Sequence, residues 1–350
     1  MRAFTVSSMS RKIQIGIGAL LTIVVGAVFY FSFFAKRGPT QLPEASVPQE
    51  EAEIIRHPLT GESMTEARDF FIVSVMYDNI SESANRPGLE DASIVYEAPA
   101  EGGITRLMAI FDSSKEVTAL GPIRSARPYF VEWASEYGGV YMHVGGSFEA
   151  LRMLHASDLV DIDQIGAHAR YFYRAESLSA PHNVFTSFTS WLQIGERFEV
   201  PSHHLMSWQY DELAPHEPKQ QQVEIVYWKG NEVAWAYNLD QNNYVRFLNG
   251  DRVLFSNGNQ IAASNIVVMA VPTAVIDSIG RLRLDTTGSG PATIYRNGEA
   301  IDARWIKDSA EARTRFVSTD QTEVVLNAGT TWIEVIPSLD DVTYSVFDAE

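Results

Sequence analysis

The longest apolar stretch of the chain lies near its start and holds no charged residue between Lys12 and Lys36. It runs from Ile13 to Phe34, and a helix of about 22 residues is roughly 33 Å long, which matches the hydrocarbon core of a bilayer. The pattern therefore predicts a transmembrane helix at residues 13–35. A cleaved signal peptide is the alternative, but its apolar region is only about 7 to 15 residues long and ends at small residues, where this chain has two phenylalanines.

The charges that flank this stretch predict its orientation. Arg2, Arg11 and Lys12 precede it, and only two basic residues follow it directly. Because basic residues favour the cytoplasmic side, residues 1–12 are expected in the cytoplasm and the bulk of the chain outside. The prediction is a single-pass protein of the cell membrane whose remaining residues are extracytoplasmic.

Beyond the apolar stretch, the hydrophobic pattern predicts a linker and then an α/β domain. Residues 36–55 are rich in Pro, Glu and small polar residues and have too few apolar side chains to pack, so they are expected to form a flexible linker. In residues 56–201, strand-like apolar runs alternate with helical patterns. The helical patterns cover residues 128–137, 147–155 and 187–198.

The second half of the chain has a different pattern. Residues 202–222 form a polar connector, and residues 223–338 are a series of short apolar runs separated by turn signals such as Asn249-Gly250 and Asn297-Gly298. This predicts an all-β domain, a sandwich or a barrel-like fold, followed by a tail at residues 339–350. The fold class expected for the chain is thus an α/β domain plus an all-β domain, preceded by one transmembrane helix.

Charge and composition exclude several kinds of partner. The chain has 27 basic and 44 acidic side chains, and its first 37 residues include five of the basic ones and none of the acidic ones. The remainder is strongly acidic, which disfavours nucleic acid as a partner. The chain has no cysteine, which excludes disulfides and a lipid-modified cysteine. No pattern typical of a metal or cofactor site is present, so none is expected.

A polar segment interrupts the apolar strands of the first half, and it contains the sequence GPIRSARP at residues 121–128. Pro128 suits the first position of a helix, which would place Ser125 and Arg127 at the positive helix end. Together with Arg124, these groups could bind a phosphate or a carboxylate. The alternative is that the arginines form ion pairs with acidic residues of the chain, and the sequence does not decide between the two.

Two carboxylates lie in the same polar segment. Glu97 ends a strand-like run, and Glu101 follows just before two glycines. Two close carboxylates could share acid and base catalysis, as in enzymes that cleave glycosides. A structural role is the alternative, in which Glu97 pairs with Arg106 across a turn.

The sequence HVGGS places Ser147 between a strand and a helix, as in the nucleophile elbow of hydrolases. Glu149 occupies the position where that motif requires a glycine, so a helix cap is the better interpretation of Ser147. Gly145, Gly146 and the helix start could still bind an anion.

Two histidines could transfer protons. His143 ends a strand, and His182 lies in a loop together with Asn183. We expect Glu101 or His143 to be the catalytic group if the protein is an enzyme, which the sequence leaves open.

Longer blocks of sequence resemble a known family. They include HPLTG (57–61), YDN (77–79), RPGLEDASIVYEAPAEGGITRLMAIF, GPIRSARPYF, HVGGS and PHN, and, in the second half, YVRF, NIVVM, GSGPATIYRNG, ARWIK and LNAGTTWIEVIP. In this order they resemble the YerB-like bacterial envelope proteins, over most of the chain from residue 57 to residue 337. The resemblance implies a protein of the cell envelope, in a family of unknown function whose members are mostly described as lipoproteins. This chain departs from that pattern because it has no cysteine.

Together these observations predict a membrane-anchored envelope protein that binds or processes an anionic or glycan-type component of the cell wall. The predicted cleft comprises Glu97, Glu101, Arg106, Arg124, Arg127, His143 and His182. A non-catalytic scaffold that recruits envelope-synthesis proteins through the β domain is the alternative.

Overall fold

The computed structural model describes residue 30 and residues 54–80, 86–202, 207–211 and 220–347. Residues 54–350 form one compact unit. Across these described ranges, no helix combines the length and apolar character needed to cross a membrane. The transmembrane helix expected at residues 13–35 lies outside the described residues except for Tyr30, so the single-pass prediction finds no support in the structure.

The fold is mostly β, and its centre is a mixed sheet of ten strands in the order β21-β20-β19-β16-β23-β4-β5-β3-β6-β7. The first half of the chain contributes β3 (Ile72–Asp78), β4 (Ile94–Ala100), β5 (Ile104–Asp112), β6 (Val140–His143) and β7 (Val160–Asp163). The second half contributes β16 (Asn265–Ala270), β19 (Gly288–Arg296), β20 (Glu299–Lys307), β21 (Arg315–Ser318) and β23 (Thr331–Ile336).

The predicted fold class is therefore wrong. Strands from the two halves of the chain join in one sheet, because β4 pairs with β23 in parallel. The prediction failed because both strands are apolar runs of a kind that also fits a separate domain, and periodicity does not show which strands pair.

A second sheet covers one face of the ten-stranded sheet. Its strands are β14 (Asp251–Arg252), β13 (Asn243–Leu248), β12 (Asn231–Asn238), β11 (Gln220–Trp228) and β24 (Val342–Phe347), with β15 (Ala262–Ala263) paired to β13. Buried side chains of this sheet, among them Ile225 and Trp235, pack in one core with Val75 and Val95 of the larger sheet. This core lies between the two sheets.

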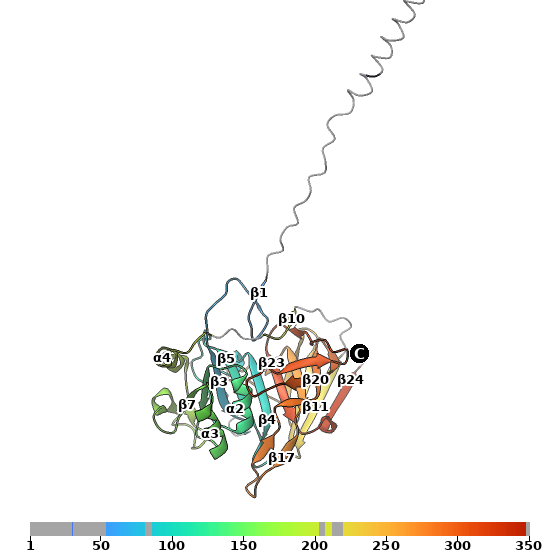
Figure 1. The fold of residues 1–350 in the computed structure, drawn as a ribbon. Helices are drawn as coiled ribbons and strands as arrows, with labels where there is room; N and C mark the ends of the chain where they lie inside the picture. Colours follow the sequence, from blue (N-terminus) through green and yellow to red (C-terminus); the bar gives the residue numbers. More distant parts are fainter. Residues whose placement is uncertain (1–29, 31–53, 81–85, 203–206, 212–219, 348–350) are drawn as a thin grey trace, which may run out of the picture. The chain divides into compact units, whose positions relative to one another are not determined.

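Helices cover the first-half strands (Figure 1). They are α2 (Pro128–Ser135), α3 (Phe148–Ala156) and α4 (Phe188–Phe198), which begin within one residue of the predicted starts. Phe130 of α2 and Leu154 of α3 pack with Ile72 and Met76 of β3 in a core on the face opposite the second sheet. In β3, alternate side chains enter the two cores, as the pleat of a strand requires.

Small paired elements border these layers. The paired strands are β1 (Ile55–Arg56) with β2 (Ser63–Met64), β8 (Tyr173–Arg174) with β9 (Val184–Phe185), β10 (Tyr210–Asp211) with β22 (Leu326–Asn327), and β17 (Thr273–Val275) with β18 (Leu282–Leu284). The described chain also has 3₁₀ turns at Leu89–Asp91, Ala169–Tyr171 and Leu339–Asp341.

Six strands of the large sheet run in the same direction, namely β3, β4, β6, β7, β16 and β23. Their carboxyl ends therefore meet along one side of the sheet, which we call the carboxyl edge. The β17–β18 hairpin follows β16 at this edge, whereas β1, where the described chain begins, lies at the opposite end of the unit (Figure 1).

Candidate anion-binding site at the carboxyl edge

Residues 121–127 form a segment that lies between the ends of β3 and β6. The amide of Arg124 donates to the carbonyl of Met76 (3.0 Å), and the amide of Val144 donates to the carbonyl of Arg124 (3.1 Å). The amide of Ala126 donates to the carbonyl of Gly145 (2.9 Å). These bonds fix the backbone of the segment and bring its side chains to the carboxyl edge.

The segment ends where α2 begins. Pro128 occupies the first turn of α2, and Arg127 is the extended residue before it, as the sequence predicts. Arg127 donates through Nε and Nη2 to the two carboxylate oxygens of Glu101, at 2.5 and 2.7 Å. Burial opposes ionisation of Glu101, but the hydrogen bonds and charge of Arg127 prevail and lower its pKa. Glu101 is thus an ionised partner of Arg127.

Arg106, near the start of β5, has no comparable partner. Only 4% of the residue is exposed, and its Nη1 donates to the carbonyl of Ser125 at 2.9 Å. Among the described residues, no carboxylate forms an ion pair with it. Burial, followed by the charge of Arg127, lowers the pKa of Arg106 to about 10. Since a guanidinium has five donors, most of the hydrogen-bonding capacity of Arg106 is unused.

Asp78 ends β3 directly opposite Arg106 in the sheet. It is buried, and its Oδ2 accepts a hydrogen bond from Nδ1 of His182. The same oxygen lies 3.6 Å from Nε of Arg124, whose Nη1 donates to the carbonyl of Pro181 at 3.3 Å. Asp78 thus joins an arginine and a histidine from two different loops.

Arg86 is a second buried arginine without a carboxylate partner in the described part of the chain. Its Nε donates to the carbonyl of Asp78 (3.0 Å), and its Nη2 donates to the carbonyl of Ile80 (3.4 Å). Burial, and then the charge of Arg246, lower the pKa of Arg86 to about 10.

Glu97 does not reach the arginines of the 121–127 segment. Its side chain is buried on the other face of the sheet, where it accepts hydrogen bonds from Asn79 (2.8 Å), Thr105 (2.7 Å) and Arg246 (2.7 Å). Arg246 comes from β13 of the second sheet and is itself 2% exposed.

Glu334 of β23 is a second buried carboxylate. It lies beside Glu97 because the two residues are register partners in the parallel pairing of β4 and β23. It accepts hydrogen bonds from Tyr227 and Trp235, both at 2.7 Å. Burial, and then the charge of Glu97, raise the pKa of Glu334 to about 8. This network links the two sheets and lies inside the protein.

The residues predicted around His143 form a separate cluster. His143 is fully buried, and its ring nitrogens bond to the carbonyl of Gly145 (2.8 Å) and to Asp161 (2.7 Å). Asp163 accepts the amide hydrogen of Gly145 at 2.7 Å. Both ring nitrogens of His143 thus have hydrogen-bond partners within the protein, which is typical of a histidine with a structural role.

The neighbouring predicted residues also have local partners. Ser147 caps α3, because its hydroxyl accepts from the amide of Ala150 at 3.3 Å. Gly146 forms a bridge with Ala126 of the 121–127 segment. The side-chain oxygen of Asn183 accepts from Arg174 at 2.7 Å.

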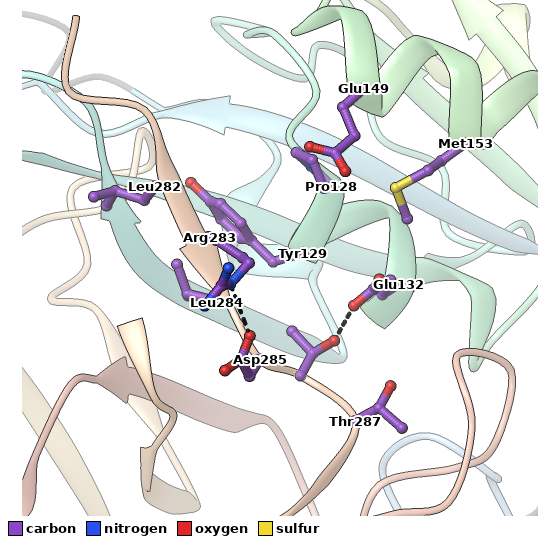
Figure 2. Close-up of a pocket in the computed structure, with 11 residues that line it drawn as sticks. Pro128, Tyr129, Glu132, Glu149, Met153, Leu282, Arg283, Leu284, Asp285 and Thr287 are labelled. Carbon is purple, nitrogen blue, oxygen red and sulfur yellow. Dashed lines mark hydrogen bonds and ion pairs between the residues drawn. The ribbon is translucent and has the colours of Figure 1, made fainter. Parts of the chain in front are cut away.

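A groove of about 480 Å³ lies next to the start of α2 (Figure 2). Its lining residues come from α2, α3 and the β18 region, and include Pro128, Tyr129, Glu132, Glu149 and Met153. Because Pro128 directly follows Arg127, the groove begins beside the 121–127 segment.

The fold and the site define a class of protein: a mostly β, two-sheet protein with an arginine-rich carboxyl edge. Residues 59–199 match the family model described as "Protein of unknown function (DUF3048) N-terminal domain", and residues 223–333 match the one described as "Protein of unknown function (DUF3048) C-terminal domain". The chain therefore belongs to the DUF3048 family, and the resemblance to YerB-like proteins is confirmed.

Two comparisons with proteins of Bacillus subtilis agree with this family assignment. The chain is 28% identical over 307 residues to "Putative lipoprotein YerB" of strain 168, covering 84% of this chain and 90% of the relative. It is also similar to the crystal structure of the YerB protein, with a TM-score of 0.75 and 27% identity over 83% of this chain and 99% of the other.

The predicted site thus divides in three. One group, at the 121–127 segment, contains Glu101, Arg106, Arg124, Ser125, Arg127 and His182, with Asn183 in the same loop as His182. Glu97 belongs to the network between the sheets, and His143 belongs to the cluster with Gly145. The residues that sequence reasoning missed are Asp78, Arg86, Arg246 and Glu334, all of which lie in sequence blocks that already marked the family.

Proposed function

We propose that this chain is an envelope protein that binds an anionic component of the cell wall at its carboxyl edge. The observation that carries the proposal is Arg106, a buried guanidinium with one backbone acceptor and no carboxylate partner in the described structure. A buried cation of this kind is costly unless an anion compensates it. A bound phosphate or carboxylate would supply that charge.

The surrounding charges favour the same conclusion. At the described carboxyl edge, Arg106, Arg124 and Arg127 lie with the carboxylates Asp78 and Glu101, whereas Arg86 also interacts with Arg246 and Glu97 of the network between the sheets. This local excess of positive charge occurs in a chain of net charge −17. A positive site in an acidic protein selects small anions and disfavours large acidic partners.

The envelope location is supported by the relative named as a lipoprotein. It also agrees with the position of the site, because the chain enters the unit at β1, at the end opposite the β17–β18 hairpin of the carboxyl edge (Figure 1).

Titration calorimetry with inorganic phosphate tests the proposal. The full-length protein is compared with Arg106→Gln and with Arg304→Gln, a control that removes an equal charge from an exposed position on β20. A charged hydrogen bond contributes about 1.5 to 3 kcal/mol, so Arg106→Gln is expected to bind phosphate roughly 10- to 100-fold more weakly. Arg304→Gln should bind like the parent. Equal affinity for all three proteins, or no binding by the parent, would contradict the proposal.

A further inference from the structure

The loop that carries His182 is fixed beside the arginine segment. The amide of Ile123 donates to the carbonyl of Val184 at 2.8 Å, and Leu120 and Thr186 exchange backbone hydrogen bonds at 2.9 and 3.0 Å. Arg124 adds its bond to the carbonyl of Pro181. The position of the imidazole is therefore set by the fold.

Asp78 determines how this imidazole is presented. Asp78 is 1% exposed, whereas 30% of the His182 side chain is exposed. Because Nδ1 of His182 bonds to the carboxylate of Asp78, the Nδ1 proton is committed to that bond. The accessible nitrogen is then Nε2, for which no partner occurs in the described structure. A neutral ring presents a lone pair at Nε2, and only the imidazolium presents an N–H there.

The charged groups around His182 come from several different elements of the fold. Asp78 lies at the end of β3, Arg124 lies in the 121–127 segment, and Arg106 lies opposite Asp78 on β5. Arg86 bonds to the backbone of Asp78. An anion bound by Arg106 and Arg124 would favour the protonated form of an imidazole beside it.

We propose that this site takes a phosphoryl group and that His182, oriented by Asp78, is its proton-carrying member. The inference rests on the proposed function. Arg106, Arg124 and Arg127 exceed Asp78 and Glu101 by one charge, and the imidazolium of His182 adds a second, which together match a doubly charged ligand. Three donors from separate elements match a tetrahedral oxyanion better than a carboxylate. Binding transfers up to one proton from a buffer acid to Nε2, so that an N–H bond forms at Nε2 as the bond to hydrogen in the buffer acid breaks. Nε2 then donates a hydrogen bond to a ligand oxygen, and no bond of the ligand breaks.

Calorimetry of the full-length protein with sulfate and phosphate tests this step. Sulfate does not titrate near neutral pH, so any proton taken up when sulfate binds is taken up by the protein. The uptake is obtained at pH 7.5 from the dependence of the binding enthalpy on the ionisation enthalpy of the buffer. The variants are His182→Gln and, as a control, His155→Gln, an exposed histidine at the end of α3.

The parent and His155→Gln should take up a measurable fraction of a proton with sulfate and bind phosphate at least about tenfold more tightly than acetate. His182→Gln should lose the proton uptake and bind phosphate about tenfold more weakly. If His182→Gln matches the parent in both, the inference is wrong, even where Arg106→Gln still weakens phosphate binding. Failure of the parent to bind either anion would instead reject the proposed function itself.

Discussion

Replacement of Glu334 by glutamine probes the buried network between the two sheets. Glu97 receives hydrogen bonds from Arg246 and two further donors, whereas Glu334 receives them from Tyr227 and Trp235 alone among the described residues. Because burial and the neighbouring charge of Glu97 raise the pKa of Glu334 to about 8, Glu334 holds a proton at neutral pH. Glutamine has the same shape as the protonated acid: its oxygen can accept from Trp235, and its amide N–H can donate to the hydroxyl oxygen of Tyr227.

The sign of the effect follows from linkage. An unfolded glutamate has a pKa near 4.5, so between that pH and about 8 the folded protein holds a proton that the unfolded chain has released. The stability that Glu334 contributes is complete below the unfolded pKa and is lost as the pH rises through the folded pKa. The loss is about 1.4 kcal/mol per pH unit, so the advantage of Glu334→Gln should grow from zero near pH 4 to about 3 kcal/mol at pH 7 and about 5 kcal/mol above pH 8.

Urea unfolding at a series of pH values, followed by tryptophan fluorescence, measures this difference. Glu232→Gln, an exposed position on β12, serves as the control and should differ from the parent by a constant amount. Parallel curves for Glu334→Gln and the parent between pH 5 and pH 8 would refute the reasoning. So would a parent that is the more stable protein at pH 8, since Glu334 would then be ionised and stabilising in the folded state.

Two further predictions concern the first half of the chain. Ser147→Ala removes the cap of α3 and should lower the free energy of unfolding by about 0.5 to 2 kcal/mol without changing phosphate affinity. Urea unfolding measures the stability, and calorimetry measures the affinity. A loss of phosphate binding at unchanged stability would contradict the cap assignment. Glu101→Gln breaks the two-point pair with Arg127 and should cost about 1 to 2 kcal/mol at pH 7. Since Arg127 lowers the pKa of Glu101, that cost should shrink as the pH falls through the folded-state pKa, and a cost that persists at pH 2 would show that the charge pair is not its source.

Local structure and the site segment could be predicted from the sequence. The starts of α2 and α3 follow from Pro128 and Ser147, whose preferences act within one turn of chain. The concentration of Arg124 and Arg127 in a turn-rich segment indicated a polar site without any knowledge of the fold. These features depend on neighbours in sequence.

The rest depends on contacts between distant strands. Glu97 meets Glu334 only because β4 pairs with β23, and Arg246 reaches Glu97 from the second sheet. Apolar periodicity predicts that each strand exists but does not predict its partner. For the same reason the sequence grouped His143 with the arginines, whereas pairing with β7 directs it to Asp161.

The most direct test of the central claim is an NMR titration of the full-length protein that follows the Nε–Hε signals of its arginines during addition of inorganic phosphate. If the carboxyl edge binds an anion, the signals of Arg106 and Arg124 should shift and saturate at phosphate concentrations that leave the signal of the exposed Arg304 unchanged. Signals of Arg106 and Arg304 that move together without saturation, or an Arg106 signal that does not move, would show that the carboxyl edge is not an anion-binding site.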